Sequence, residues 1–255
     1  MTGGGHGEAE LRRLGAAPSL IVGVDFDGTL SNIVDRPQDA RALPGASEVL
    51  AALADIPRTW VAVISGRALV DLERLMVVPA GVLRVGSHGL ETSGRPAGLE
   101  PAQAERLALT RTALRSLADE VPGVVLEPKS WSVAVHYRHA DHERDVPRVL
   151  EFAAALSRDH GLWSKHGKEV VELFVAPASK AEAVAALRAD HPGATVVYLG
   201  DDVTDEEVFT ALAPGDLGVK IGEGVTAAAL RLAEPVDALA WLRRLAQRRS
   251  QAAER

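Results

Sequence analysis

The 255-residue sequence contains no cysteine and no long apolar run. The absence of cysteine excludes disulfides, thiol catalysis and metal sites with cysteine ligands. No apolar run reaches the roughly 18 residues that a membrane-spanning helix needs. The N-terminal stretch MTGGGHGEAE also has no hydrophobic signal region. We therefore expect a soluble, cytoplasmic protein that does not bind a membrane.

Basic residues are also in short supply. The chain has 28 Lys plus Arg against 35 Asp plus Glu, which gives a net charge of −7. Because the basic residues form no long run either, this balance argues against binding to nucleic acid or to an anionic membrane. The length suits one large domain or a domain with a smaller insert. We expect a small-molecule partner, with a monomer as the simplest state.

Short, continuous apolar runs alternate with helical patterns along much of the chain. Such runs are typical of strands that are buried on both faces of a parallel sheet. The strand candidates are 20–24, 60–64, 83–86, 195–199 and 217–221. The helix candidates are 45–54, 69–76, 180–190, 205–213 and 236–249. This alternation predicts an α/β fold with a Rossmann-like parallel sheet.

The pattern changes in the middle of the chain, where two strand candidates follow each of two helices. These elements are a helix over 102–120, strands over 124–128 and 131–138, a helix over 142–159, and strands over 162–166 and 169–175. The repeated order predicts an inserted α+β domain with antiparallel pairing. The predicted divisions are a disordered tail (1–17), a core (18–92 plus 177–255) and the inserted domain (93–176).

Polar side chains stand at the ends of three of the apolar runs in the core. They are Asp25 and Asp27 after the first run, Ser65 after the second, and Asp201, Asp202 and Asp205 after the run at 195–199. Because ligands bind at the carboxyl ends of parallel strands, we expect these groups to converge. Clustered carboxylates repel one another unless they are neutralised, and an all-oxygen cluster suits Mg²⁺.

Each of these motifs has a plainer explanation when it is taken alone. Asp27-Gly28-Thr29 has the composition of an ordinary turn, Ser65 suits a turn, and Asp205 suits a helix N-cap. The functional interpretation is that Gly28 lets the backbone turn beside an anion, while Thr29 and Ser65 offer hydroxyl donors. The occurrence of all three motifs at the ends of buried runs favours a common site.

Lys180 is an independent indication of anion binding. It opens the helix at 180–190, where a positive charge opposes the helix dipole, behind a predicted Ser179…Glu182 capping box. A surface lysine tolerates that position, which is the plainer explanation. Its place between the insert and the last acidic motif favours a lysine that holds a phosphate and the charge that develops on it.

Together these residues resemble the four motifs of the haloacid dehalogenase-like (HAD) phosphatases. The motifs are Asp25-Phe26-Asp27-Gly28-Thr29, Ser65-Gly66-Arg67, Lys180 and Gly200-Asp201-Asp202-Val203-Thr204-Asp205-Glu206. The last motif is similar in particular to that of the trehalose-6-phosphate phosphatases. Four further stretches resemble that family, namely Ser87-His88-Gly89, Glu127-Pro128-Lys129, the run 132–138, and Gly167-Lys168 with Val171-Glu172-Leu173. The resemblance covers about residues 20 to 225.

The resemblance implies a Mg²⁺-dependent, two-step phosphate transfer that releases trehalose as the last step of its biosynthesis. Asp25 would be the nucleophile that forms an aspartyl-phosphate. Asp27 would protonate the leaving sugar oxygen and then activate water. Ser65 and Lys180 would bind the phosphoryl oxygens. The implied metal ligands are Asp25, the Asp27 carbonyl and Asp201, with Asp202 and Asp205 in support.

The resemblance also implies that the insert is a cap, which closes over the sugar and excludes water. The implied substrate contacts are Asp25, Phe26, Asp27, Gly28, Thr29, Gly66, Arg67 and His88 in the core, and Glu127, Lys129, Lys168 and Glu172 in the cap. Charged side chains of both signs suit sugar hydroxyls, although a solvated strand face is the plainer explanation of the cap residues. A functional link to a trehalose-6-phosphate synthase is implied as well.

Two positions depart from the family pattern. Phe174-Val175 stand where the family has a basic residue and proline, and Ala181 stands where it has glycine. Neither departure touches the phosphate-transfer groups, but the first bears on the sugar. One alternative is therefore a HAD phosphatase for another phosphorylated disaccharide or glycoside. The other is a non-catalytic sugar-phosphate sensor, which would need no leaving-group acid at Asp27.

Overall fold

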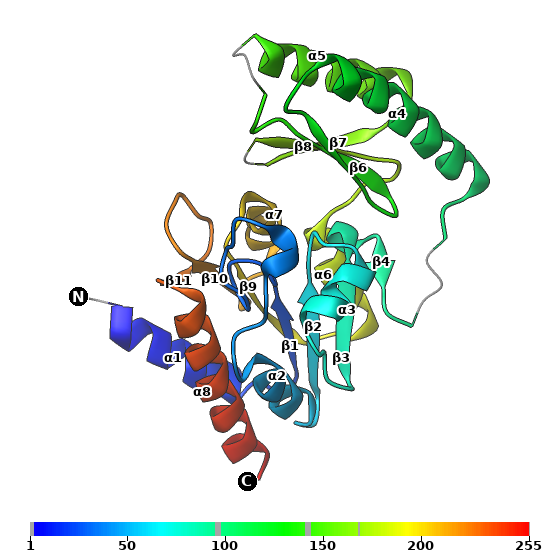
Figure 1. The fold of residues 1–255 in the computed structure, drawn as a ribbon. Helices are drawn as coiled ribbons and strands as arrows, with labels where there is room; N and C mark the ends of the chain where they lie inside the picture. The colour runs from blue at the N-terminus through cyan, green and yellow to red at the C-terminus, as the bar shows by residue number, and fades with distance from the viewer. Residues whose placement is uncertain (1–2, 95–97, 141–143, 168, 255) are drawn as a thin grey trace. The chain divides into compact units, whose positions relative to one another are not determined.

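The computed structural model describes residues 3–94, 98–140, 144–167 and 169–254 (Figure 1). The chain forms two compact units. Residues 1–94 and 179–255 make up the first, which we call the core unit, and residues 95–178 make up the inserted unit. Among the described helices, none combines the length and the apolar character that crossing a membrane requires.

A seven-stranded sheet with the order β11-β10-β9-β1-β2-β3-β4 is the centre of the core unit. The strands are β1 (Leu20–Val24), β2 (Thr59–Ile64), β3 (Val82–Gly86), β4 (Glu91–Thr92), β9 (Thr195–Gly200), β10 (Leu217–Ile221) and β11 (Leu230–Leu232). Neighbouring strands are parallel except for β3 and β4. All five residues of β1 are buried, because helices cover both faces of the sheet. The predicted α/β class is confirmed.

Two groups of helices supply the cover. They are α1 (Gly3–Gly15), α2 (Ala46–Ala54), α3 (Leu69–Leu75) and α8 (Pro235–Ala253) on one face, and α6 (Lys180–Asp190) and α7 (Val203–Ala211) on the other. Successive residues of a strand point to opposite faces. Val22 of β1 accordingly packs with the first group, while its neighbour Ile21 packs with the second.

The inserted unit is a four-stranded antiparallel sheet with the order β5-β6-β8-β7, covered by two helices (Figure 1). Its elements are α4 (Pro101–Glu120), β5 (Val125–Pro128), β6 (Ser132–His136), α5 (Asp145–Asp159), β7 (Trp163–Gly167) and β8 (Val170–Phe174). Val133, Val135 and Leu173 pack against Leu114 of α4 and Val149 of α5. The other face of the sheet is therefore the one that carries polar side chains.

The N-terminal segment is helical, so the prediction of a disordered tail over 1–17 is wrong. Helix α1 covers Gly3–Gly15, and its Leu11 and Leu14 are fully buried in the core that α8 shares. Glu8 forms ion pairs with Arg244 and Arg248 of α8. The glycine-rich start of the segment suggested disorder, but the two leucines three residues apart gain their stability from a helix that lies more than 200 residues away.

Two smaller expectations also fail, and one strand was not predicted. The predicted Ser179…Glu182 capping box is absent, because the Ser179 hydroxyl instead donates to Glu207. Helix α7 begins at Val203 rather than at Asp205. Strand β11 was not predicted at all, since its three residues are too short for a periodic pattern to be detected.

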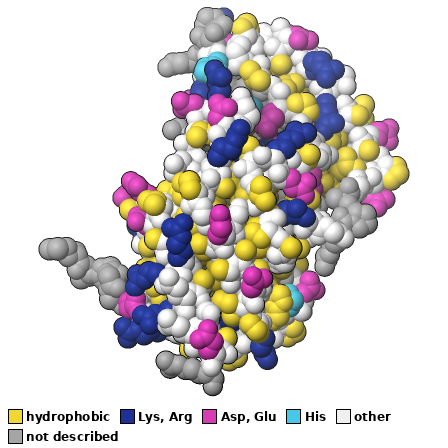
Figure 2. Space-filling view, turned by 60° about the horizontal axis from the view of Figure 1, so that its bottom comes forward, with side chains coloured by type: hydrophobic (Ala, Val, Ile, Leu, Met, Phe, Trp, Pro, Cys, Tyr) yellow, Lys and Arg dark blue, Asp and Glu magenta, His cyan; other side chains and the backbone are white. Residues whose placement is uncertain are grey.

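Figure 2 shows one face of the molecule by side-chain type. On the part of this face that is coloured, basic and acidic side chains are interspersed, and neither sign forms a broad field of its own. A protein that binds nucleic acid typically presents a basic patch or stripe. The coloured part of this face instead shows basic and acidic side chains mixed together.

Candidate active site

The carboxyl ends of β1 and β9 lie side by side. Val24 pairs with Leu199 in the register, and the Asp25 N–H donates to the Leu199 carbonyl over 2.9 Å. Asp25 and Asp201 directly follow the two strands. They therefore lie next to each other at the carboxyl-terminal end of the sheet. Open α/β sheets bind their ligands at this carboxyl-terminal end.

Lys180 is buried at this end of the sheet and contacts two carboxylates. Its Nζ lies 2.9 Å from Asp25 Oδ1 and 2.8 Å from Asp205 Oδ1. Burial opposes the charge of the ammonium, but the two carboxylates outweigh it and hold the pKa of Lys180 above its ordinary value. The lysine is thus a permanent cation beside Asp25, and the interpretation of Lys180 as a surface lysine is wrong.

Asp205 is fully buried and every direction around its carboxylate is used. Oδ2 accepts the N–H groups of Asp201 and Asp202, each over 3.0 Å. Oδ1 accepts the Tyr198 hydroxyl over 2.7 Å as well as Lys180. Burial, together with the charge of Asp205, raises the pKa of Tyr198 well above its usual range. The tyrosine therefore stays protonated and acts as a donor.

Three carboxylates form an acidic cluster around the lysine. One oxygen each from Asp25, Asp201 and Asp205 can be chosen so that all lie within 4.8 Å of one another. Burial raises the pKa of Asp25 well above its usual range, although Lys180 opposes this shift. Burial and the charges of Asp205 and Asp202 raise the pKa of Asp201 to about 7. One ammonium does not balance three carboxylates, and Asp205 is already fully hydrogen-bonded. Asp25 and Asp201 are therefore the oxygen donors of this set that fit a divalent cation such as Mg²⁺.

Gly28 brings the β1 loop close to this cluster. Its φ is +69°, and a Cβ at this position would stand only 2.0 Å from Asp201 Oδ2. Any side chain would therefore displace the Asp201 carboxylate. Next to it, the Thr29 hydroxyl is buried and has no hydrogen-bond partner among the described residues.

Asp27 lies outside the acidic cluster, on Arg67. The guanidinium of Arg67 donates from Nε and Nη2 to the two carboxylate oxygens of Asp27, over 2.7 and 2.6 Å, and lies over the Phe26 ring. This bidentate geometry fixes the plane of the carboxylate. The side chain of Asp25 lies in the acidic cluster and that of Asp27 does not, whereas the metal contact implied for Asp27 is through its main-chain carbonyl. Asp202 is exposed and also stands outside the cluster.

The loops after β2 and β3 pack on each other. Ser65 is buried, its carbonyl accepts the His88 N–H over 3.0 Å, and the Arg67 carbonyl accepts the Ser87 N–H over 2.7 Å. A Cβ on Gly66 would stand 2.6 Å from the His88 ring. The structure thus places His88 beside the Ser65-Gly66-Arg67 loop, as a contact of that loop.

A second buried lysine was missed in the sequence. The Lys220 ammonium on β10 donates to the Asp201 main-chain carbonyl and lies 3.5 Å from Glu206 Oε1. The signal that could have found it is a lysine inside the otherwise apolar run LGVKI. Tyr198, a hydroxyl within the apolar run TVVYL, was missed for the same reason, because both were counted only as strand residues.

The polar face of the inserted unit carries two groups of side chains, and hydrogen bonds connect the members within each group. Glu172 accepts from Lys129 over 3.0 Å and from the Ser132 hydroxyl. On the same sheet, His136 Nε2 lies 2.9 Å from Glu127 Oε2. Lys168, which was also predicted to contact the substrate, lies outside the described residues. Phe174 is buried.

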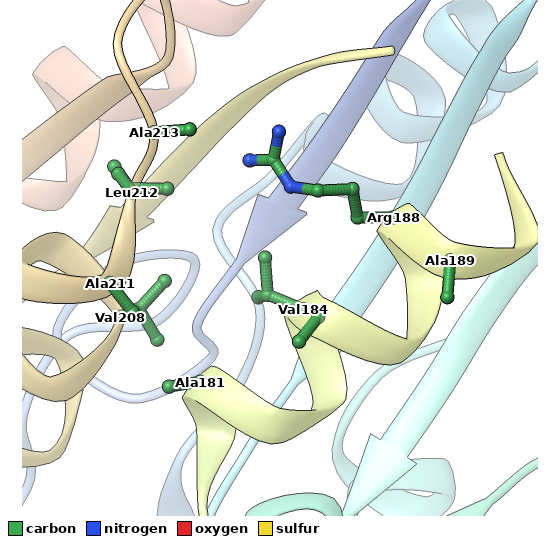
Figure 3. Close-up of a pocket in the computed structure, with 9 residues that line it drawn as sticks. Ala181, Val184, Arg188, Ala189, Val208, Ala211, Leu212 and Ala213 are labelled. Carbon is green, nitrogen blue, oxygen red and sulfur yellow. The ribbon is translucent and has the colours of Figure 1, made fainter. Parts of the chain in front are cut away.

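A separate pocket of about 400 Å³ lies between α6 and α7 (Figure 3). Its lining is mainly alanine and other small apolar side chains, with Arg188 at one side. Arg188 is itself paired with the buried Asp216. The pocket contains none of the acidic residues of the cluster, so we do not assign the chemistry to it.

Comparison with known proteins agrees with this arrangement. The trehalose-phosphatase family matches residues 23–229, which include every part of the cluster. The chain belongs to the trehalose-phosphatase family.

A curated relative and two solved structures give the extent of the likeness. A trehalose-phosphate phosphatase of Mycobacterium avium is 40% identical over 96% of this chain, which spans 65% of that protein's length. The C-terminal domain of Candida albicans trehalose-6-phosphate phosphatase superposes with a TM-score of 0.76 at 22% identity, over 97% of this chain and 98% of that one. A haloacid dehalogenase-like hydrolase of Bacteroides thetaiotaomicron superposes with 0.64 at 15% identity, over 88% and 99%. The two superpositions show that the fold is HAD-like.

Proposed function

We propose that this chain is a phosphatase that hydrolyses trehalose 6-phosphate to trehalose and phosphate, with Mg²⁺ as its cofactor. The observation that carries the proposal is Lys180, which is buried between Asp25, after β1, and Asp205, in the first turn of α7. Membership of the trehalose-phosphatase family supports the substrate. A buried cation and carboxylates in one fixed geometry suit the transfer of a phosphoryl group, whose negative charge must be stabilised as it moves.

In this mechanism the two aspartates after β1 have separate tasks. The Asp25 carboxylate attacks phosphorus, and the bond from phosphorus to the sugar oxygen breaks. One of the two bonds from Arg67 to Asp27 opens when Asp27 binds a proton; Asp27 then gives that proton to the sugar oxygen and later takes one from the water that hydrolyses the aspartyl-phosphate. The bidentate contact with Arg67 holds the Asp27 carboxylate in a defined plane. This separation suits two groups that must do different chemistry.

The acidic cluster would hold the metal ion. Its ligands would be Asp25, Asp201 and the Asp27 carbonyl, with Asp202 and Asp205 in support. A bound Mg²⁺ supplies positive charge that offsets the repulsion between a carboxylate and a phosphate dianion. Lys180 and the Ser65 hydroxyl would bind the phosphoryl oxygens.

The inserted unit would be the cap that recognises the sugar. Its contacts would be Glu127, Lys129, Lys168 and Glu172, and the core would add Phe26, Gly28, Thr29, Gly66, Arg67 and His88. The described pairs in the cap combine carboxylate acceptors with ammonium and hydroxyl donors. Such a set can exchange its internal bonds for bonds to sugar hydroxyls.

A substrate panel tests this function. Phosphate release is measured from trehalose 6-phosphate, sucrose 6-phosphate and glucose 6-phosphate, with Mg²⁺ and with EDTA. We expect metal-dependent release, selective for the first substrate, and a loss of turnover in Asp25→Asn with the fold retained. The matched control is Asp71→Asn, which removes an exposed carboxylate of α3 that pairs with Arg74.

The other outcomes of this panel are equally informative. Selective release from another sugar phosphate would keep the chemistry and reject trehalose 6-phosphate. No release from any of the three would favour a sugar-phosphate sensor. Turnover by Asp25→Asn at the wild-type rate would reject Asp25 as the nucleophile.

A further inference from the structure

One buried hydroxyl beside the acidic cluster has no role in the mechanism above. Tyr198 of β9 is fully buried, and its hydroxyl donates to Asp205 Oδ1 over 2.7 Å. The same oxygen accepts from Lys180 Nζ over 2.8 Å. We propose that Tyr198 is a positioning residue, whose hydroxyl fixes the Asp205 carboxylate and thereby the Lys180 ammonium. This inference deepens the proposed function and rests on it.

The hydroxyl matters because two carboxylates, Asp25 and Asp205, compete for the Lys180 ammonium. Asp205 Oδ2 is already used by two main-chain N–H groups at the start of α7. With Tyr198 on Oδ1, the ammonium satisfies only the remaining acceptor direction of that oxygen, and its Nζ also lies 2.9 Å from Asp25. Without the hydroxyl, Oδ1 has Lys180 as its only partner. Asp205 then draws the lysine toward itself and away from Asp25.

The sheet is built to admit this tyrosine ring. Gly23 of β1 lies opposite Tyr198 in the strand register, and a Cβ at Gly23 would stand 2.7 Å from the ring. On another side, the Phe209 ring meets it edge-on, with the ring centres 5.9 Å apart. A glycine inside a buried strand weakens the strand and often marks a close approach. Here the close approach is the ring that delivers the hydroxyl to Asp205.

The first test removes the hydroxyl alone. In Tyr198→Phe we expect kcat for trehalose 6-phosphate to fall about tenfold, because a buried acceptor loses its partner, while KM changes by less than about twofold. The same fall is expected with p-nitrophenyl phosphate, which has no sugar. Tyr137→Phe is the matched control, since the chain has 2 tyrosines and Tyr137 lies in the inserted unit. It should keep the wild-type kcat.

The second test does not depend on turnover. The Kd of inorganic phosphate in the presence of Mg²⁺ is measured by calorimetry for Tyr198→Phe, Asp205→Asn and the double variant. We expect Tyr198→Phe to weaken phosphate binding about fivefold alone and to have no further effect in the Asp205→Asn background. Such non-additivity is expected only if the tyrosine acts through Asp205.

Each remaining outcome is decisive. A wild-type kcat and a wild-type Kd in Tyr198→Phe would overturn the inference, and so would equal losses in both Asp205 backgrounds. A Tyr198→Phe protein with no cooperative melting transition would also overturn it, because the hydroxyl would then serve folding. Failure of the wild-type protein to hydrolyse either phosphate ester would reject the proposed function, while the calorimetric cycle would still decide the role of Tyr198.

Discussion

Two groups of charged side chains, one in each unit, differ in how far they are buried. The side chain of Lys180 in the core unit is 3% exposed and contacts two carboxylates. In the inserted unit the His136 and Glu127 side chains are 38% and 44% exposed and contact each other. Buried charges interact strongly and stay in place, whereas exposed pairs are screened and exchange partners easily. Lys180 and its two carboxylates are therefore held more firmly than the His136–Glu127 pair.

Removal of the Lys180 ammonium should have the largest effect on both stability and phosphate release. In Lys180→Met, Asp25 and Asp205 would be left buried without their cation, at a cost of about 3–5 kcal/mol in the free energy of unfolding. We expect phosphate release to fall by at least about a thousandfold. Urea unfolding and phosphate release measure the two effects.

The matched control is Lys129→Met in the inserted unit, which breaks a less buried pair with Glu172. Its expected cost is about 1 kcal/mol. Equal losses of stability in the two variants would show that the two units do not differ in how they use charge.

A smaller effect should separate recognition from chemistry. Glu127→Ala and Lys129→Ala should raise KM for trehalose 6-phosphate about fivefold, because each removes a group that can bond a sugar hydroxyl. KM for p-nitrophenyl phosphate, which has no sugar, should change by less than about twofold. Glu120→Ala, at the end of α4 and paired with Arg148, is the control. Equal changes for both substrates would mean that Glu127 and Lys129 do not contact the sugar.

The smallest expected effect is a pH dependence of stability in the metal-free protein. The pKa of Asp201 is raised from 3.8 to about 7 in the fold, so the folded state binds this proton more tightly than the unfolded state. Its contribution to stability is therefore complete below about pH 4 and is lost as the pH rises toward 7 and above. Urea unfolding in EDTA from pH 5 to 8 should show a shallower decline for Asp201→Asn than for the wild type. Parallel declines would contradict the raised pKa.

Much of the fold could be predicted because its signals are local. The apolar runs that became β1, β2, β9 and β10 are long enough to identify buried strands, and they end where polar residues begin. Helix α1 was missed because its stability comes from α8, at the far end of the chain. Strand β11 was missed because three residues carry no periodicity.

The candidate site was predicted less completely than the fold. The sequence indicated Asp25, Lys180 and Asp201 as members of one site, since each stands next to a buried strand or opens a helix. Tyr198 and Lys220 were not recognised, because each lies within an apolar strand and the residue that each contacts, Asp205 or Asp201, is known only from the fold. Residue type at a strand end is visible in a sequence, whereas a hydrogen-bond partner is not.

The sequence by itself therefore determined the α/β class and the carboxylates that stand at the carboxyl ends of β1 and β9. Only the tertiary structure decided how the charges pair. In the fold Lys180 forms ion pairs with Asp25 and Asp205, and Arg67 forms one with Asp27. The physical reason is that periodicity depends on near neighbours, whereas ion pairing depends on burial and on distances between residues up to about 155 positions apart.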